Sequence, residues 1–99
     1  MQNSLFRRSY WRNRVYAYLQ QESIKERSPT IQRSAQEIAR AIGMSNPKNV
    51  STVMKQLEQM GLIEIEQEID ILGRLRPNFY TILPMEAERR MMLLQLCKT

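Results

Sequence analysis

The chain has 99 residues, a size that favours one domain built around a single hydrophobic core over residues 1–99. Its net charge is +5, which fits a protein that binds a polyanion, and 42% of its residues are hydrophobic, as in ordinary globular domains. No apolar run approaches the roughly 20 residues that span a bilayer, and no secretory signal is recognisable. We therefore expect a cytoplasmic protein without membrane association.

The residue types that enzymes and metal sites use most are nearly absent. The chain contains no histidine and a single cysteine, Cys97. Histidine is the commonest general base and metal ligand, so a zinc site within one chain is not expected. There is also no glycine-rich phosphate loop and no nucleophile elbow. The sequence therefore predicts a protein that is not an enzyme and that holds no metal or cofactor.

Charge is distributed unevenly along the chain. Residues 1–14 contain four arginines and no acid, a net charge of +4, whereas residues 56–70 contain five acids and no base, a net charge of −5. A protein polarised in this way can present a basic face to DNA while its acidic side points away. Charges that are simply solvated over the surface would give the same totals.

The first element is predicted as a helix over residues 3–21, which are free of glycine and proline. The apolar residues at three- and four-residue spacing in it are Trp11, Val15, Tyr18 and Leu19. Residues 22–33 read as a polar connection that stops at Ser28-Pro29, with a possible short strand at residues 30–32.

Two further helices are predicted within residues 34–60. Ser34 and Glu37 have the spacing of a capping box, and Gly43 follows the helix that they begin. Asn46 and Pro47 form a strong start for the next helix, because asparagine caps well and proline suits the first helical turn. The two apolar faces consist of Ala35, Ile38, Ala39 and Ile42, and of Val50, Val53, Met54 and Leu57.

The hydrophobic period changes from 3.6 to 2 after Gly61, which predicts a hairpin over residues 62–83. Its first strand alternates Ile63, Ile65, Ile69 and Ile71 with Glu64, Glu66, Glu68 and Asp70, the pattern of a half-buried strand. Those carboxylates lie about 6.6 Å apart along one strand face, so they diverge and do not converge on a metal ion. Pro84 then precedes a last predicted helix over residues 85–97.

This order of elements resembles the winged helix-turn-helix family of prokaryotic transcription regulators over residues 30–83. Residues 34–39 are similar to the first helix of the motif, and residues 43–45 to its turn. Residues 50–63 are similar to the recognition helix running into the wing, most specifically in Leu57-x-x-x-Gly61-Leu62-Ile63. Residues 43–50 are one residue longer than the family pattern, which leaves open which residue makes the first contact with DNA.

The resemblance implies a mainly α fold with a small β-hairpin wing, a winged helix-turn-helix with flanking N- and C-terminal helices. A major groove admits one α-helix that turns polar side chains outward, while basic residues of the wing lie against the backbone or in the minor groove. The predicted DNA-binding residues are Ser45, Lys48, Asn49, Ser51, Thr52, Lys55 and Gln56, with Arg74 and Arg76 on the wing. Among them, Asn49 and Lys55 are predicted to read the sequence.

The two wing arginines have a second interpretation. If the hairpin loop is the three residues 71–73, Asp70 faces Arg74 and Glu68 faces Arg76, so that the arginines can pair with the acidic strand. If the loop is only residues 72–73, they are not opposite. The sequence does not choose between DNA contact and ion pairing.

The C-terminal helix carries more apolar surface than one core requires. One row of its apolar residues can cover the domain, and the other then needs a partner. The predicted dimer interface consists of Met91, Met92, Leu93 and Leu96. Alternatively, both rows wrap a single monomeric core. A methionine-rich stripe is usually packing material, so no small-molecule ligand is predicted.

We therefore expect a homodimer that binds specific sequences of double-stranded DNA, most simply a transcriptional regulator. Within the same class, the protein could serve replication, partition or recombination of a plasmid or phage. A different class is a winged-helix module that binds protein and not DNA. Salt distinguishes the two classes, because DNA binding weakens steeply as salt rises and an apolar protein contact does not.

Overall fold

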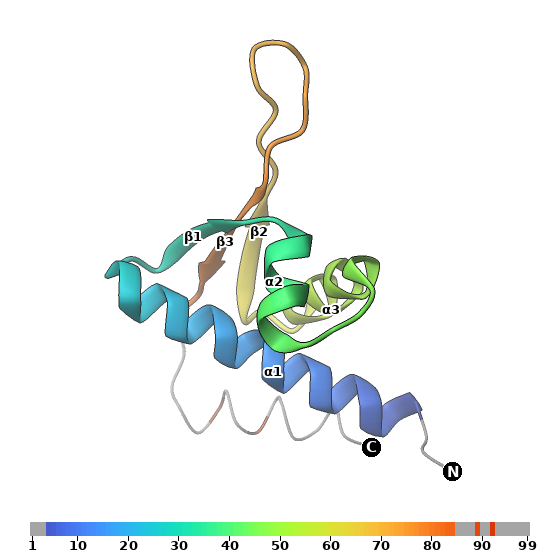
Figure 1. Cartoon of the computed structure of the whole chain (residues 1–99). Helices are drawn as coiled ribbons and strands as arrows, with labels where there is room; N and C mark the ends of the chain where they lie inside the picture. The colour runs from blue at the N-terminus through green and yellow to red at the C-terminus, as the bar shows by residue number, and fades with distance from the viewer. Residues whose placement is uncertain (1–3, 85–88, 90–91, 93–99) are drawn as a thin grey trace.

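The computed structural model describes residues 4–84 together with Arg89 and Met92. Within these residues, the chain forms α1 (Ser4–Glu26), β1 (Thr30–Arg33), α2 (Ala35–Ile42), α3 (Pro47–Gln59), β2 (Ile63–Glu66) and β3 (Asn78–Ile82). The helices gather beside a small antiparallel sheet, and a long hairpin loop projects from the sheet on the side away from α1 (Figure 1). The described part of the chain is therefore a mixed fold of three helices and a three-stranded sheet.

Helix α1 extends five residues beyond its predicted end at Gln21. Apart from Ile24, residues 22–26 are polar, and none of them is a glycine or a proline, so the helix continues until the chain approaches Pro29. Arg27 adopts a left-handed conformation (φ 54°), and its N–H donates to the Ile24 carbonyl at 3.2 Å, while Ser28 N–H donates to Ser23 at 3.1 Å. These two bonds form a Schellman motif, which terminates the helix.

Both predicted ends of α2 are confirmed. The Ser34 hydroxyl accepts from the Glu37 N–H at 3.1 Å, and the Glu37 carboxylate accepts from the Ser34 N–H at 2.9 Å, which completes the capping box. Gly43 follows the helix with a φ of 80°, a conformation that other residues adopt only with strain. The short helix therefore has a fixed length and direction.

Helix α3 also begins and ends as predicted. The Asn46 side chain accepts from the Lys48 N–H at 3.0 Å, with Pro47 in the first turn. At the other end, Leu62 N–H donates to the Leu57 carbonyl at 3.1 Å across Gly61. Since Leu57 and Leu62 are both fully buried, this end of α3 is fixed in the core before the chain enters β2.

The sheet has the order β1-β3-β2, and both pairs of neighbouring strands are antiparallel. The possible strand at residues 30–32 is real and one residue longer, so the hairpin predicted from residues 62–83 belongs to a three-stranded sheet. Tyr80 of β3 pairs with Ile31 on one side and with Ile65 on the other. The helices cover this inner face, and the most deeply buried side chains of the core are Val15, Leu19, Ile38, Val50, Met54, Leu57, Leu62 and Ile63.

Strand β2 is shorter than the strand predicted through Ile71. It ends at Glu66, and beyond it Ile69 is 61% exposed and Ile71 is 99% exposed. The alternation of apolar and acidic residues is real, but the hairpin runs past α1, α2 and α3, so none of the described elements covers it there (Figure 1). The prediction of a half-buried strand was wrong for this outer part.

An ion-pair cluster joins β1 to the end of α1. The Arg33 guanidinium bonds to the Glu22 carboxylate at 3.1 Å and also to Glu26, and Lys25 lies 3.2 Å from Glu22. The hydrogen bond from Arg33 is the largest cause of a lowered pKa at Glu22. This cluster fixes the direction in which the chain leaves α1.

The lowered pKa of Glu22 predicts a pH dependence. Because the folded protein holds this pKa below the ordinary value of 4.5, its stabilisation is complete above that value and is lost as the pH falls through the lowered pKa. We expect Glu22→Gln to lower the free energy of unfolding by about 0.5 kcal/mol near neutral pH. Urea unfolding at several pH values should show this difference shrinking on acidification; a difference independent of pH would contradict the assignment.

Candidate nucleic-acid interface

Helix α3 presents a polar and cationic row to solvent. Its buried side consists of Val50, Val53, Met54 and Leu57. Because an α-helix turns about 100° per residue, the side directly opposite consists of Lys48, Thr52, Lys55 and Gln59, all of them exposed. No acid occurs in α3 before Glu58. Two lysines and two neutral hydrogen-bonding side chains thus line the face that the core leaves free.

The flank of α3 nearer to α1 differs from the prediction. Gln56 was expected to point outward, but it is half-buried, and its side-chain oxygen accepts from the Arg12 guanidinium at 3.2 Å. Arg12 itself is only 6% exposed. Gln56 therefore helps to hold α3 against α1. Asn49, two turns earlier on the same flank, is exposed but lies off the central row.

A second arginine of the basic N-terminal segment also joins helices. The Arg14 guanidinium donates to the Ile42 carbonyl at 2.8 Å, at the C-terminal end of α2, where unpaired carbonyls and the helix dipole favour a cation. It also stacks over Tyr10, 5.7 Å from the ring centre. Arg12 and Arg14 thus fasten α1 to α3 and α2, a use of the segment's charge that its composition did not indicate.

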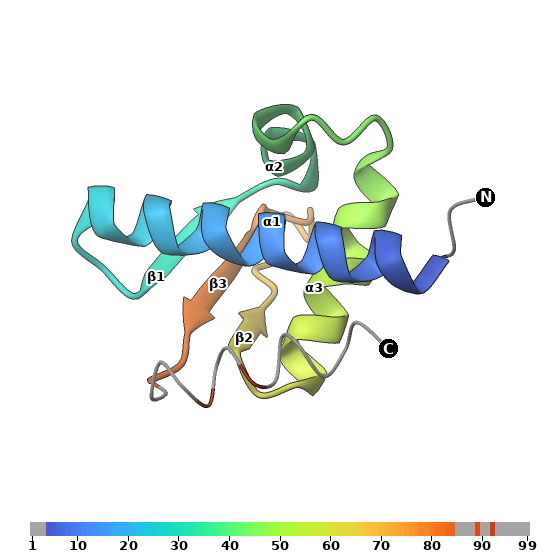
Figure 2. The ribbon, with the colours of Figure 1, turned by 90° about the horizontal axis from the view of Figure 1, so that it is seen from below.

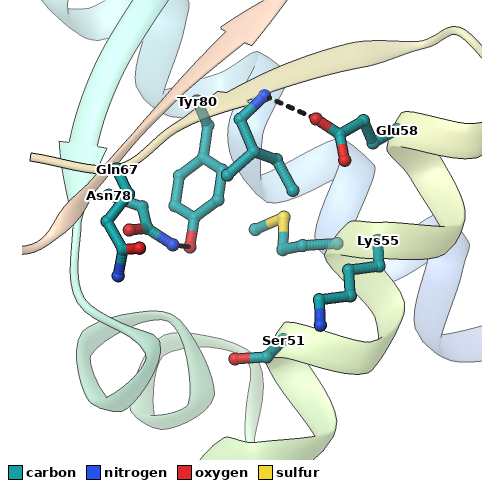
Figure 3. Close-up of a pocket in the computed structure, with 8 residues that line it drawn as sticks. Ser51, Lys55, Glu58, Gln67, Asn78 and Tyr80 are labelled. Atoms are coloured by element: carbon teal, nitrogen blue, oxygen red, sulfur yellow. Dashed lines mark hydrogen bonds between the residues drawn. The ribbon is translucent and has the colours of Figure 1, made fainter.

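A groove of about 370 Å³ lies between α3 and the base of the hairpin. Its lining residues are Ser51, Met54, Lys55, Glu58, Ile65, Gln67, Asn78 and Tyr80. Figure 3 shows Ser51 and Lys55 on one wall, contributed by α3, and Gln67, Asn78 and Tyr80 on the other. Of these residues, only Ser51 and Lys55 were predicted as part of a site, because the groove exists only once β3 is paired beside α3.

Two hydrogen bonds hold the walls of this groove. The Glu58 carboxylate accepts from the Ile65 N–H at 3.3 Å, which ties α3 to the free edge of β2, as the dashed line in Figure 3 shows. The Asn78 amide donates to the Tyr80 hydroxyl at 3.5 Å. Burial raises the pKa of Tyr80, so its hydroxyl stays protonated at neutral pH. The groove therefore offers neutral polar groups on the sheet side and both a lysine and the Glu58 carboxylate on the helix side.

The hairpin loop has three residues, which decides between the two arrangements of the wing arginines. Asp70 N–H donates to the Arg74 carbonyl at 2.9 Å, and Arg76 N–H donates to the Glu68 carbonyl at 2.8 Å. The Arg74 guanidinium lies 3.0 Å from the Asp70 carboxylate, and that of Arg76 lies 4.0 Å from Glu68. Hydrogen bonds, first from the Arg74 backbone, lower the pKa of Asp70. Both arginines thus face the acidic strand.

The remaining predicted residues are placed as follows. Ser45 is exposed in the turn between α2 and α3. Within the described residues, no group of three or more histidines, cysteines or acids is arranged to hold a metal ion. The C-terminal helix predicted over residues 85–97, with Met91, Leu93 and Leu96, lies outside the described residues. The exceptions are Arg89 and Met92, which are helical, and Met92 is 60% exposed.

Figure 2 views the molecule from the side of α1, which crosses α3, whereas the hairpin projects from the other side in Figure 1. Among the described residues, no helix combines the length and the apolar character that crossing a bilayer requires.

No model of a known protein family matches the chain, and the searches of curated proteins and of solved structures also gave no match.

Proposed function

We propose that this chain is a winged helix-turn-helix protein that binds specific sequences of double-stranded DNA, most simply as a transcriptional regulator. The observation that carries the proposal is the exposed row of Lys48, Thr52 and Lys55 on α3, a helix whose other sides are held by α1, α2 and the sheet. The capped helix pair α2–α3 and the projecting hairpin support the same assignment.

In this proposal, α3 enters a major groove with its exposed row toward the bases. Lysine can reach guanine or phosphate, and threonine can bond to any base or to the backbone. Ser51, on the groove side of α3, lies next to this row and is also exposed. Because α1 lies on the opposite side of the molecule from the hairpin, it leaves this approach open (Figures 1 and 2).

Salt dependence is the first test of the proposal. Binding of the full chain to a fluorescent random duplex should be measured by anisotropy at several salt concentrations. Each phosphate that the protein neutralises contributes a slope of about −0.9 in log K against log salt, so contacts by Lys48 and Lys55 alone predict about −1.8 for each bound chain and about −3.6 for a bound dimer. No binding at low salt would contradict DNA binding and favour the alternative of a protein-interaction module.

The proposed regulator acts as a homodimer, which places two α3 helices in successive major grooves. The interface is assigned to Met91, Met92, Leu93 and Leu96, of which Met92 is described and 60% exposed. Light scattering should give twice the mass of one 11.8 kDa chain, and Met92→Glu with Leu96→Glu should give the monomer. A monomeric intact chain at tens of micromolar would contradict the dimer, and a folded variant that remains dimeric would place the interface elsewhere.

A further inference from the structure

The outer part of the hairpin, residues 67–77, is a two-stranded ribbon with two unlike faces. Ile69 and Leu75 pair directly across it and therefore lie on one face. Side chains alternate along a strand, so the neighbouring pairs, Asp70–Arg74 and Glu68–Arg76, occupy the other face. The apolar residues of the ribbon, here called the aliphatic tip, are Ile69, Ile71, Leu72 and Leu75, and they are 61%, 99%, 72% and 67% exposed.

The Ile69–Leu75 pair at the base of the aliphatic tip is directed to the same side as α3. No extra residue interrupts the strand from Ile65 to Ile69, because the additional residue of the bulge lies at Pro77-Asn78 on the returning strand. Ile69 therefore continues the face of Ile65 and Gln67, which line the groove against α3. The apolar face of the ribbon extends one wall of that groove beyond the protein body.

Nothing in the described part of the chain covers this apolar surface. A two-stranded ribbon without a covering layer is marginally stable in water, and aliphatic side chains on it remain hydrated. The other face, in contrast, is well organised. Asp70 accepts from the backbone of Leu72 and Arg74, and Gln32 of β1 donates to Glu68 at 3.1 Å and to Pro77 at 3.0 Å. The ribbon is thus held in place from its charged face, with its aliphatic face free.

We propose that the aliphatic tip is a wedge that enters the minor groove of DNA beside the major groove occupied by α3. This inference rests on the proposed function. The ribbon spans about 20 Å from Glu66 to Leu72, at about 3.3 Å per residue, which is enough to pass over one sugar-phosphate strand. Aliphatic side chains inserted at a base step unstack it and kink the duplex by roughly 20–90°. The wing contact is then apolar, since the two arginines pair with acids on the other face.

A second copy of the chain is a poorer occupant. The tip comprises only four aliphatic side chains. A stable protein interface buries about 800 Å² on each partner, so the tip alone is too small to hold one. On DNA the tip needs to supply only part of the contact, because it continues the groove that α3 borders.

The test compares variants of the aliphatic tip with variants of the two arginines in one assay of DNA binding and bending. A duplex of about 30 base pairs, enriched from a random pool by the intact chain, carries a fluorophore at each end so that energy transfer reports bending. Ile71→Ala with Leu72→Ala should bind about tenfold more weakly and lose the bend, with the slope of log K against log salt unchanged. Arg74→Ala with Arg76→Ala should keep the bend and nearly the same slope. Ile24→Ala, which removes an exposed aliphatic residue from α1, is the matched control.

Each outcome is decisive for one of the two proposals. If the intact chain binds DNA and the tip variant matches it in affinity and bend, the wedge is wrong and the proposed function stands. If the intact chain binds no duplex, the proposed function fails first. If tip substitution instead dissociates a protein dimer, the tip is a protein interface and the wedge is overturned. Urea unfolding checks that the tip variant is folded, which its exposed positions lead us to expect.

Discussion

Replacing Lys48 and Lys55 together by alanine is expected to weaken binding to all duplex sequences by tenfold or more and to reduce the salt slope by about two units for each bound chain. Both lysines are exposed on the row of α3 opposite its buried side, and no ion pair is found for either within the described part of the chain. Their charge is therefore available to phosphate. Neither side chain contributes to the core, so stability should change little.

The matched control is Lys25→Ala, which removes one lysine charge from α1, where Lys25 is paired with Glu22. Anisotropy titrations of all three proteins on one random duplex, at four or more salt concentrations, separate a local contact from an effect of net charge. If Lys25→Ala lowers affinity and salt slope per charge as much as the α3 variant does, the binding depends on overall charge and α3 has no special role.

The largest effect on stability is expected at Leu57, which joins α3 to the core. Its side chain is fully buried, and its carbonyl accepts the hydrogen bond from Leu62 that ends the helix. Leu57→Ala should lower the free energy of unfolding by about 2–5 kcal/mol, since it removes buried apolar surface and leaves a cavity. A domain of this size is stable by only about 5–15 kcal/mol, so this one substitution should remove a large part of the stability.

Urea unfolding followed by circular dichroism measures this loss, with Ile24→Ala as the control. Ile24 is 76% exposed on α1, and its truncation should change stability by less than about 0.5 kcal/mol. A loss below about 1 kcal/mol at Leu57 would contradict the packing of α3 described here, and with it the orientation of the exposed row.

The ends of α2 and α3 could be predicted because the signals that determine them are local. A capping box, an asparagine before proline and a glycine after the last apolar residue each act within one helical turn. The apolar spacing of Val50, Val53, Met54 and Leu57 likewise fixed which side of α3 is buried. The helix caps and the apolar spacing together predict the exposed row of α3, but they do not predict which residues at the flanks of that row are exposed.

The flanks of this row, and the surfaces next to it, depend on contacts between segments that are distant in the sequence. Gln56 faces α1 only because Arg12, 44 residues earlier, is buried beside it. The groove requires β3 to lie next to α3, and the exposure of Ile69 and Ile71 depends on where the helices stop covering the sheet. The alternation of the hairpin indicated two faces correctly, but period alone does not say whether a face is covered.

The proposed DNA reading by α3 is tested most directly by selecting bound sequences from a random duplex pool with the intact chain and with Thr52→Ala and Asn49→Ala. The intact chain should enrich one motif, palindromic if the protein is a dimer. Asn49 was predicted to read the sequence, but Thr52 lies on the central row of α3 and Asn49 on its flank, so Thr52→Ala should relax one position of the motif more than Asn49→Ala does. A base contact accounts for about 1–3 kcal/mol of discrimination at its position. If the intact chain enriches no motif, or if Thr52→Ala and Asn49→Ala both enrich the motif of the intact chain unchanged, α3 does not read DNA.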